Sequence, residues 1–345
     1  MINKKINSIF ALLLALAISL TSCSDDDDNN NESDNYESVS VYASNNSNGN
    51  ISVYDFESGV NTQSRILITS STAADGIFYD DDSESVYQVS RSNNSIEGFT
   101  NIDDLVNGSV LNTDFTGTND MSSPREMAVR GNVFVVADNA DVDDDVTTAD
   151  GRLYIYTYSG GTFSLRNVIT TDFKLWGITF NDNDLYAVVD ATNELAVFND
   201  FLSHTTDTTI SASKRIAIEG IVRTHGITYD NDTDTLIMTD IGDASNGQDD
   251  GGFHIIENFT NKFNAVANGE TMAVAGNQVR ISGAATLLGN PVDVAYDSEN
   301  EIVYIAEAGN AGGRILGFSN VLAGGNIAPT FNSTLASASS VYLED

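Results

Sequence analysis

Short runs in which apolar and polar residues alternate recur along most of the chain. The clearest group starts at residue 291 with Pro-Val-Asp-Val-Ala-Tyr-Asp. It continues after a polar turn with Ile-Val-Tyr-Ile-Ala-Glu and closes with Arg-Ile-Leu-Gly-Phe at residues 314–318. Alternation with a period of two predicts β-strands that bury one face, and the polar turns predict antiparallel pairing. The sequence therefore predicts an all-β fold built from a recurring group of strands.

This group of strands occurs six times. Its first strands contain residues 76, 126, 177, 226, 293 and 340, and one interval, which we assign to a long loop, exceeds the others. A fourth apolar run, such as residues 64–68 or 215–218, lies between the third strand and the next group. Four antiparallel strands in about 50 residues are typical of one blade of a β-propeller.

The two ends of the repeat region complete one another. Residues 38–43 and 51–54 fit a second and a third strand, whereas residues 340–345 fit a lone first strand. If both ends share one blade, the ring closes and no sheet edge stays free. We predict a six-bladed β-propeller of four-stranded antiparallel blades over residues 38–345.

The repeat resembles that of the NHL-repeat family of six-bladed propellers, most closely in residues 291–318. The resemblance implies the fold more than a function, since that family includes protein binders, RNA binders and a few lyases. Its zinc-dependent lyases use several histidines around the channel. This chain has only His204, His225 and His254, and we expect only His225 at the channel mouth.

The first 22 residues read as a signal peptide. A basic start at residues 1–5 precedes an apolar run at residues 9–20, which is shorter than the about 20 residues of a membrane span. The run ends in Leu-Thr-Ser-Cys, which resembles a bacterial lipobox and implies lipid attachment to Cys23, the only cysteine. The alternative is an ordinary secretory signal with a chance cysteine.

Residues 23–37 are predicted to be a disordered acidic tether. Four aspartates follow Cys23 almost directly, and the segment that joins them to the propeller is highly polar. An acidic run in this place resembles the surface-export signal of Bacteroidetes lipoproteins. We therefore expect a lipid-anchored protein on the outer face of the outer membrane; the alternative is a plain spacer with a periplasm-facing domain.

Composition narrows the range of partners. The chain has 50 acidic and 15 basic residues, for a net charge of −35, and such a field repels the phosphates of nucleic acids. One cysteine allows neither an intramolecular disulfide nor a thiolate metal cluster. We expect a monomer that contacts the membrane through its lipid and that binds no nucleic acid.

Strand direction places a set of polar residues at one mouth of the central channel. They come from the starts of first strands or the ends of second strands: Asp75, Arg125, Trp176, His225, Asp293, Asp138, Asp190, Asp240 and Glu307. One interpretation is a ligand pocket. The alternative for the acids is structural, because a carboxylate that ends a strand often accepts hydrogen bonds from its own loop. Trp176 and His225 do not recur between blades, which favours a functional role for them.

Two long acidic loops, residues 138–151 and 240–252, lie on the same predicted face. Clustered carboxylates suit Ca²⁺, which takes about six to eight oxygen ligands. The candidate ligands are Asp141, Asp143, Asp145, Asp150, Asp243 and Asp249. Neither loop has the spacing of an EF-hand, and the alternative is a pair of solvated loops without metal.

Two functions fit these observations. The first is a binding module whose loop-rich face engages a protein, a glycan or a small ligand. The second is a metal-dependent lactonase or lyase at the channel mouth that uses His225 with Asp240 and Glu307. The sequence contains no nucleophile elbow, phosphate-binding loop or His-Glu-x-x-His stretch, and this favours binding.

Overall fold

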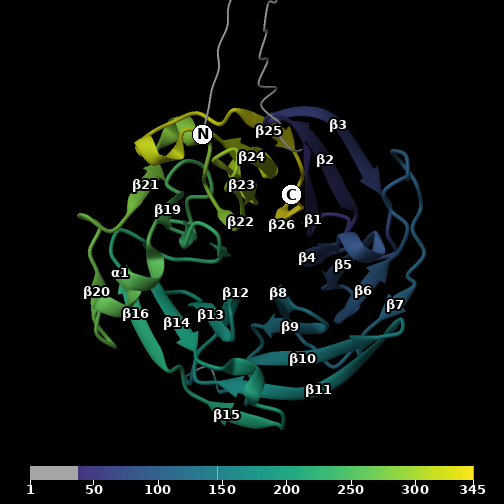
Figure 1. The fold of residues 1–345 in the computed structure, drawn as a ribbon, viewed down its shortest axis with the longest axis horizontal. Coiled ribbons are helices and arrows are strands. Elements are labelled where there is room, and N and C mark those ends of the chain that lie inside the picture. Colours follow the sequence, from purple (N-terminus) through teal and green to yellow (C-terminus); the bar gives the residue numbers. More distant parts are fainter. Residues whose placement is uncertain (1–37, 146, 345) are drawn as a thin grey trace, which may run out of the picture. The chain divides into compact units, whose positions relative to one another are not determined.

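The computed structural model describes residues 38–145 and 147–344. The expected signal peptide, Cys23 and the acidic tether lie outside the described residues. Within these residues six β-sheets are arranged around a central axis, and the first strands lie nearest that axis (Figure 1). The prediction of a six-bladed β-propeller is confirmed.

Three blades come from the first half of the propeller and the extreme C-terminus. From the axis outwards, blade 1 consists of β26 (Ala338–Glu344), β1 (Ser38–Asn45), β2 (Ile51–Glu57) and β3 (Val60–Leu67). Blade 2 consists of β4 (Ala74–Asp80), β5 (Ser85–Ser90), β6 (Ser95–Phe99) and β7 (Phe115–Thr116). Blade 3 consists of β8 (Pro124–Arg130), β9 (Val133–Asp138), β10 (Gly151–Ser159), β11 (Thr162–Thr171) and β15 (Thr208–Ile210).

The remaining three blades follow in chain order. Blade 4 consists of β12 (Leu175–Asn181), β13 (Asp184–Val189), β14 (Glu194–Phe198), β16 (Lys214–Ile218) and β20 (Thr271–Met272). Blade 5 consists of β17 (Ile227–Asp230), β18 (Thr235–Asp240), β19 (Gly252–Ile256) and β21 (Val279–Ser282). Blade 6 consists of β22 (Pro291–Asp297), β23 (Ile302–Glu307), β24 (Arg314–Phe318) and β25 (Phe331–Thr334).

Helical structure in the described part of the chain is short. The α-helix α1 (Phe259–Ala265) lies between β19 and β21, and together with β20 it accounts for much of the longer interval between repeats. Five 3₁₀ turns occur elsewhere: Asp81–Ser83, Phe201–Ser203, Ala284–Thr286, Asn310–Gly312 and Val321–Ala323. None of the helices among the described residues is long and apolar enough to cross a membrane.

Blade 1 closes the ring with strands from both ends of the domain. β26 pairs antiparallel with β1, so that Tyr342 lies opposite Tyr42 and Val341 lies opposite Ala43. This is the closure that the sequence predicts. Its physical advantage is that the inner edge of β1 is paired rather than exposed.

Two blades depart from the expected four antiparallel strands. β15 adds to the outer edge of β11, and β20 adds to the outer edge of β16, in both cases parallel. Each added strand belongs to a segment that leads into the outer strand of the following blade, so a neighbouring connection covers an edge that would otherwise be open. The alternation of apolar and polar residues within a single strand does not predict such short pairings at the edge of a sheet.

Apolar side chains fill the spaces between neighbouring blades. Between blades 3 and 4, for example, Val135 and Leu153 pack in one buried cluster with Leu185 and Phe198. Burying one such side chain contributes about 1.5–3 kcal/mol, so the sheets hold one another in place across their faces. The ring is therefore a rigid frame for side chains on its first strands.

A β-bulge interrupts the pairing near the start of the first strands. The register shifts between Ala74 and Ile77 in β4, and between Pro124 and Met127 in β8. The same shift occurs in β12 and β22, and in the pairing of β26 with β1. Because a bulge re-aims the side chains beside it, this position decides what lies on the axis.

Candidate functional site

The bulges generate two rings of equivalent residues. The mouth ring consists of Asp75, Arg125, Trp176, His225, Val292 and Ser339. The axial ring, one residue later in each strand, consists of Gly76, Glu126, Gly177, Gly226, Asp293 and Ser340. Asp293 therefore belongs to the axial ring and is the equivalent of Glu126, whereas Val292 takes its place in the mouth ring.

Four of the residues expected at the mouth form a continuous line of contacts. Nη1 of Arg125 lies 3.4 Å from Oδ2 of Asp75, and the Arg125 guanidinium lies 4.3 Å from the centre of the Trp176 ring. On the next blade the His225 imidazole stacks on Trp176, with ring centres 3.7 Å apart and an angle of 5° between the planes. Trp176 is thus held between a cation and an aromatic ring.

Asp190 extends this line through His225. Its Oδ1 lies 3.3 Å from Nε2 of His225 and 2.7 Å from Nη2 of Arg223. Burial raises the pKa of Asp190, but hydrogen bonds from His225, Asn139 and Arg223 outweigh burial, so the pKa lies well below its ordinary value. Asp190 is therefore a carboxylate over the whole physiological range.

His225 is neutral at pH 7. Burial lowers its pKa, and the neighbouring Asp190 carboxylate opposes that shift without cancelling it. A neutral imidazole that contacts a carboxylate donates a hydrogen bond to it through the ring N–H. The Nε2–H of His225 then faces Asp190, and Nδ1 is a buried acceptor without a hydrogen-bond partner.

Three arginines surround this part of the mouth. Arg91 adds a second ion pair to Asp75 at 3.5 Å, beside Arg125, while Arg223 pairs with Asp190. The three side chains are 31%, 12% and 29% exposed for Arg91, Arg125 and Arg223. The Nε–H groups of Arg125 and Arg223 are buried without a hydrogen-bond partner. Three guanidinium groups against two carboxylates leave a local excess of positive charge in a strongly acidic protein.

The other second-strand acids hold loops. Asp138, Asp240 and Glu307 are the last residues of β9, β18 and β23, and all three are buried. Each accepts hydrogen bonds from several backbone N–H groups; Glu307, for example, accepts from Gly289, Asn290, Gly309 and Asn310. Burial raises the pKa of Glu307, and these four N–H groups oppose the shift. These contacts agree with the structural alternative for these acids, in which a carboxylate at a strand end accepts hydrogen bonds from its own loop.

Asp190 differs from these three acids by one position. In the register of blade 4 Val189 lies opposite Leu175, as Asp138 lies opposite Pro124 and Glu307 opposite Pro291. Asp190 thus follows the end of β13. This offset places its carboxylate beside residues of the mouth.

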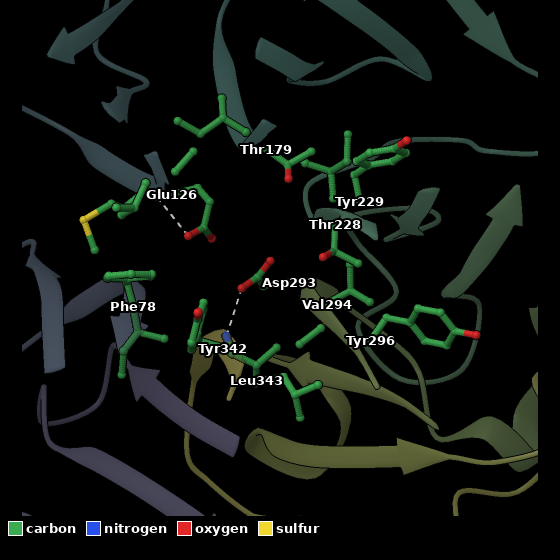
Figure 2. A pocket seen from close by; sticks show the side chains of 18 of the residues that line it. Phe78, Glu126, Thr179, Thr228, Tyr229, Asp293, Val294, Tyr296, Tyr342 and Leu343 are labelled. Carbon is green, nitrogen blue, oxygen red and sulfur yellow. Dashed lines mark hydrogen bonds between the residues drawn. The ribbon is translucent and has the colours of Figure 1, made fainter. Parts of the chain in front are cut away.

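A cavity of about 330 Å³ lies along the axis, lined by all of the first strands (Figure 2). It extends from Glu126 and Asp293 at its inner end to Phe180, Asp230 and Leu343, which lie near strand ends on the face opposite the mouth. We name it the axial cavity. Strand alternation does not predict this cavity, because the pattern describes one strand and not the space that six strands enclose.

Glu126 and Asp293 face one another at the inner end of the axial cavity. The Ser340 hydroxyl lies 2.7 Å from Oδ2 of Asp293 and 3.3 Å from Oε2 of Glu126, and the Val341 N–H donates to Asp293. Burial, more than any other cause, raises the pKa of Asp293 to about 6 and that of Glu126 well above its ordinary value. Both carboxyls therefore keep a proton to higher pH than an ordinary Asp or Glu, and the two titrations are linked.

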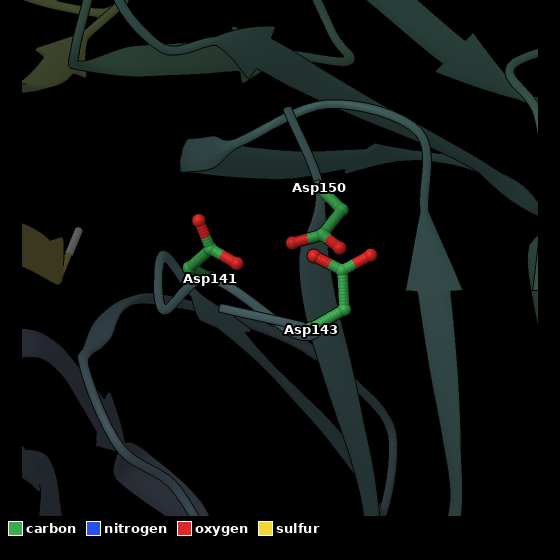
Figure 3. A group of neighbouring side chains, drawn as sticks. All are labelled: Asp141, Asp143 and Asp150. Carbon is green, nitrogen blue, oxygen red and sulfur yellow. The ribbon is translucent and has the colours of Figure 1, made fainter. Parts of the chain in front are cut away.

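The first acidic loop brings three of the candidate calcium ligands together. Oxygens of Asp141, Asp143 and Asp150 lie within 4.8 Å of one another, and no other group of three such ligands occurs among the described residues (Figure 3). Asp145 instead bonds Thr147. In the second loop Asp243 accepts from Ser245, and Asp249 accepts from Asn246. His225, Asp240 and Glu307 therefore form no group of this kind.

Sequence reasoning missed Arg91, Arg223 and Glu126. Arg91 directly follows β5 and Arg223 lies between β16 and β17, so neither stands at a first-strand start or a second-strand end, from which the candidates were taken. Glu126 carried a signal, because it and Asp293 are the two acids at first-strand positions that hold glycine in three other blades.

Comparison with known proteins shows the fold alone. No protein-family model and no curated protein matches the chain. A chain of the nidogen/laminin complex is 12% identical with a TM-score of 0.58, covering 89% of this chain and 98% of the other. Candidate 6-phosphogluconolactonases from Bacteroides fragilis and Bacteroides uniformis are 12% and 11% identical, with TM-scores of 0.56 and 0.54. Each covers 89% of this chain, and they are matched over 98% and 99% of their own lengths.

Proposed function

We propose that this protein is a binding module whose channel mouth takes an oxyanion: a carboxylate, sulfate or phosphate group on a glycan, a protein or a small molecule. The observation that carries the proposal is the set of three arginines around Asp75 and Asp190. Guanidinium groups are suited to such anions because their planar donors match two oxygens at once.

The contacts of the mouth favour a ligand over a purely structural network. The distances from Arg91 and Arg125 to Asp75 are 3.5 and 3.4 Å, longer than the about 2.7–2.9 Å of a strong charge-assisted hydrogen bond. Two buried Nε–H groups also lack partners, which costs free energy that an anion would recover. Stacking on Trp176 holds the Arg125 side chain in place before a ligand binds, so less side-chain entropy is lost on binding.

The test is calorimetric titration of the full chain in detergent with glucuronate, sulfate and phosphate, with methyl glucoside as the uncharged control. Arg125→Gln and Arg223→Gln should each weaken anion binding at least about tenfold. Arg130→Gln is a matched control, because Arg130 lies at the other end of β8 and donates to the carbonyl of Asp182. The proposal is wrong if these anions and an array of acidic glycans all fail to bind saturably.

A second candidate is hydrolysis of a lactone at the same mouth. It is favoured by the 3.3 Å contact of His225 with Asp190, which orients an imidazole as a general base would be oriented. Two proteins of the same fold carry a lactonase name, and the phosphate in the name of their substrate is an anion of the class that arginines bind. If the chain opens a lactone, His225→Ala should abolish turnover; unchanged turnover would exclude this site.

We further propose that Cys23 carries the lipid and that the propeller faces the cell exterior. The lipobox-like sequence and the acidic run after it support this location. Labelled palmitate should enter the wild-type chain but not Cys23→Ala. A protease added to intact cells should remove the propeller; protection in intact cells with loss after outer-membrane permeabilisation would instead indicate the periplasm.

A further inference from the structure

We propose that the axial cavity is a second binding site, for a small organic amine whose ammonium group lies between Glu126 and Asp293. The site is distinct from the mouth, since the cavity extends from the axial ring toward the opposite face. Its premises are the shape of the cavity, the sign of its charges and the aromatic side chains along its walls.

At the axial ring, neighbouring first strands approach one another closely. At Gly177 a Cβ would lie 2.4 Å from the carbonyl oxygen of His225, and at Gly226 a Cβ would lie 2.5 Å from Cα of Asp293. Side chains other than glycine therefore cannot occupy these two axial positions. The inner end of the cavity is left to the carboxyls of Glu126 and Asp293, whose oxygens point toward its centre (Figure 2).

All charged residues that line the cavity are acidic. They are Glu126, Asp293 and, at the outer end, Asp230; none of the described lining residues is Lys, Arg or His. An adjoining hollow shares Phe78 and Tyr342 with the cavity and adds further acids, Asp80, Asp81, Asp82 and Glu344. Clustered charge of one sign raises the local concentration of ligands of the other sign.

Aromatic side chains line the walls between these two ends. Phe78 and Tyr342 lie together on one side, with ring centres 5.1 Å apart. Tyr229 and Tyr296 line the other side and direct their hydroxyl groups away from the centre (Figure 2). Two carboxyls at one end and aromatic side chains along the walls match an amine that carries an aromatic group.

These features fit an organic cation better than a calcium ion. Calcium takes about six to eight oxygen ligands. The inner end offers two carboxyls and the Ser340 hydroxyl, which already contacts both of them.

Binding of an amine should change the number of protons that the protein holds, because Glu126 and Asp293 both have raised pKa values. An ammonium ion between both carboxylates favours their doubly ionised form, so protons bound to the pair leave to solvent while the amine keeps its own. Among the charged groups near the pair, Asp75 on β4 raises the pKa of Glu126 by charge repulsion, and Arg125, which precedes Glu126 in β8, pairs with Asp75. β26 contributes the neutral Ser340. β12 and β17 present Gly177 and Gly226 at this level, which do not titrate.

The experiment is calorimetric titration of the full chain with phenethylamine, with 2-phenylethanol as the uncharged analogue and Mg²⁺ and Ca²⁺ as competing ions. Titration near pH 6.5 in two buffers of different ionisation enthalpy should show that protons are released on binding. Affinity should fall as the pH is lowered below 6, by up to about tenfold per pH unit. Phenylethanol should bind at least about tenfold more weakly.

Glu126→Gln should lose at least about tenfold in affinity for phenethylamine, and the exposed Glu57→Gln is the matched control. Should Glu126→Gln not fold, the pH dependence of the wild-type chain decides. The proposal is overturned by equal binding of amine and alcohol, by affinity independent of pH, or by binding of divalent ions alone. Arg125→Gln leaves this site intact, so its result separates failure here from failure of the proposed function.

Discussion

The mouth and the axial cavity lie next to one another on the same first strands, but they differ in how their charged residues are paired. At the mouth, arginines and aspartates alternate and contact one another, and the arginines stay partly exposed. In the cavity, Glu126 and Asp293 lie together without a cation among the residues that line it. Arg125 and Glu126 are neighbours in the chain and belong to different sites. A bulge thus lets one strand serve two surfaces of opposite charge.

The comparison also separates residues that maintain the repeat from residues that break it. Asp138, Asp240 and Glu307 hold equivalent loops by accepting backbone N–H groups. Trp176, His225 and Asp190 have no equivalents of the same type and contact one another instead. In a repeat protein, the positions that depart from the consensus are where a site can be built without loss of the frame.

The largest loss of stability should come from removing β26, the strand that closes the ring on which both sites depend. Deleting residues 341–345 removes most of β26, which pairs with β1 and supplies the Val341 N–H to Asp293. The ring should open, and the melting temperature should fall by about 10 °C or more, or cooperative melting should be lost. A truncated chain that melts like the full chain would contradict the closed ring.

The next effect should distinguish loop-holding acids from mouth acids. Glu307→Ala leaves four backbone N–H groups unpaired and should cost about 2–4 kcal/mol of unfolding free energy, measured by denaturant titration. Glu301→Ala, at an exposed turn, is the control and should change little. Asp190→Asn removes a negative charge that pairs with Arg223, so it should chiefly strengthen anion binding. An equal loss of stability in Asp190→Asn would remove the distinction.

A smaller effect concerns pH. Because the pKa of Asp293 is raised to about 6, the folded chain binds more protons than the unfolded chain between about pH 4 and 6. The pair's contribution to stability is therefore present at low pH and is lost as the pH rises through the folded pKa. Relative to the double variant Glu126→Gln/Asp293→Asn, the wild-type chain should lose about 1–3 kcal/mol between pH 4.5 and pH 7. Parallel pH profiles would refute raised pKa values for this pair.

The smallest effect should be that of calcium. If Asp141, Asp143 and Asp150 bind Ca²⁺ as the sequence leads us to propose, millimolar Ca²⁺ should raise the melting temperature by a few degrees relative to a chelator. Asp143→Asn should reduce the shift, whereas Asp249→Asn in the second loop should not. The absence of any shift in the wild-type chain would mean that this loop holds no structural ion.

The fold could be predicted from the sequence because alternation and repeat length are local signals. The closure by residues 340–345 could also be predicted, since a lone strand at one end matched a missing strand at the other. The site could be predicted only in part. Asp75, Arg125, Trp176 and His225 were found from strand direction, but Asp293 was grouped with them because a bulge cannot be counted from alternation.

The residues missed by the sequence share a physical reason. Arg91 follows the end of β5 and Arg223 precedes β17, so both reach the mouth from just outside the strand positions that the sequence comparison used. Glu126 in β8 and Asp293 in β22 face one another across the axis. Because they lie far apart in the sequence, no local pattern predicts that they come together. Contacts across the axis depend on the ring as a whole, whereas the repeat describes one blade.

The most direct test uses the two neighbouring residues at the bulge of β8. The full chain should be titrated with glucuronate and with phenethylamine, alone and together, in the wild type, in Arg125→Gln and in Glu126→Gln. We predict that both ligands bind the wild-type chain at the same time, that Arg125→Gln loses only the anion, and that Glu126→Gln loses only the amine. Loss of both ligands in either variant, or mutual exclusion in the wild type, would contradict two separate sites of opposite charge.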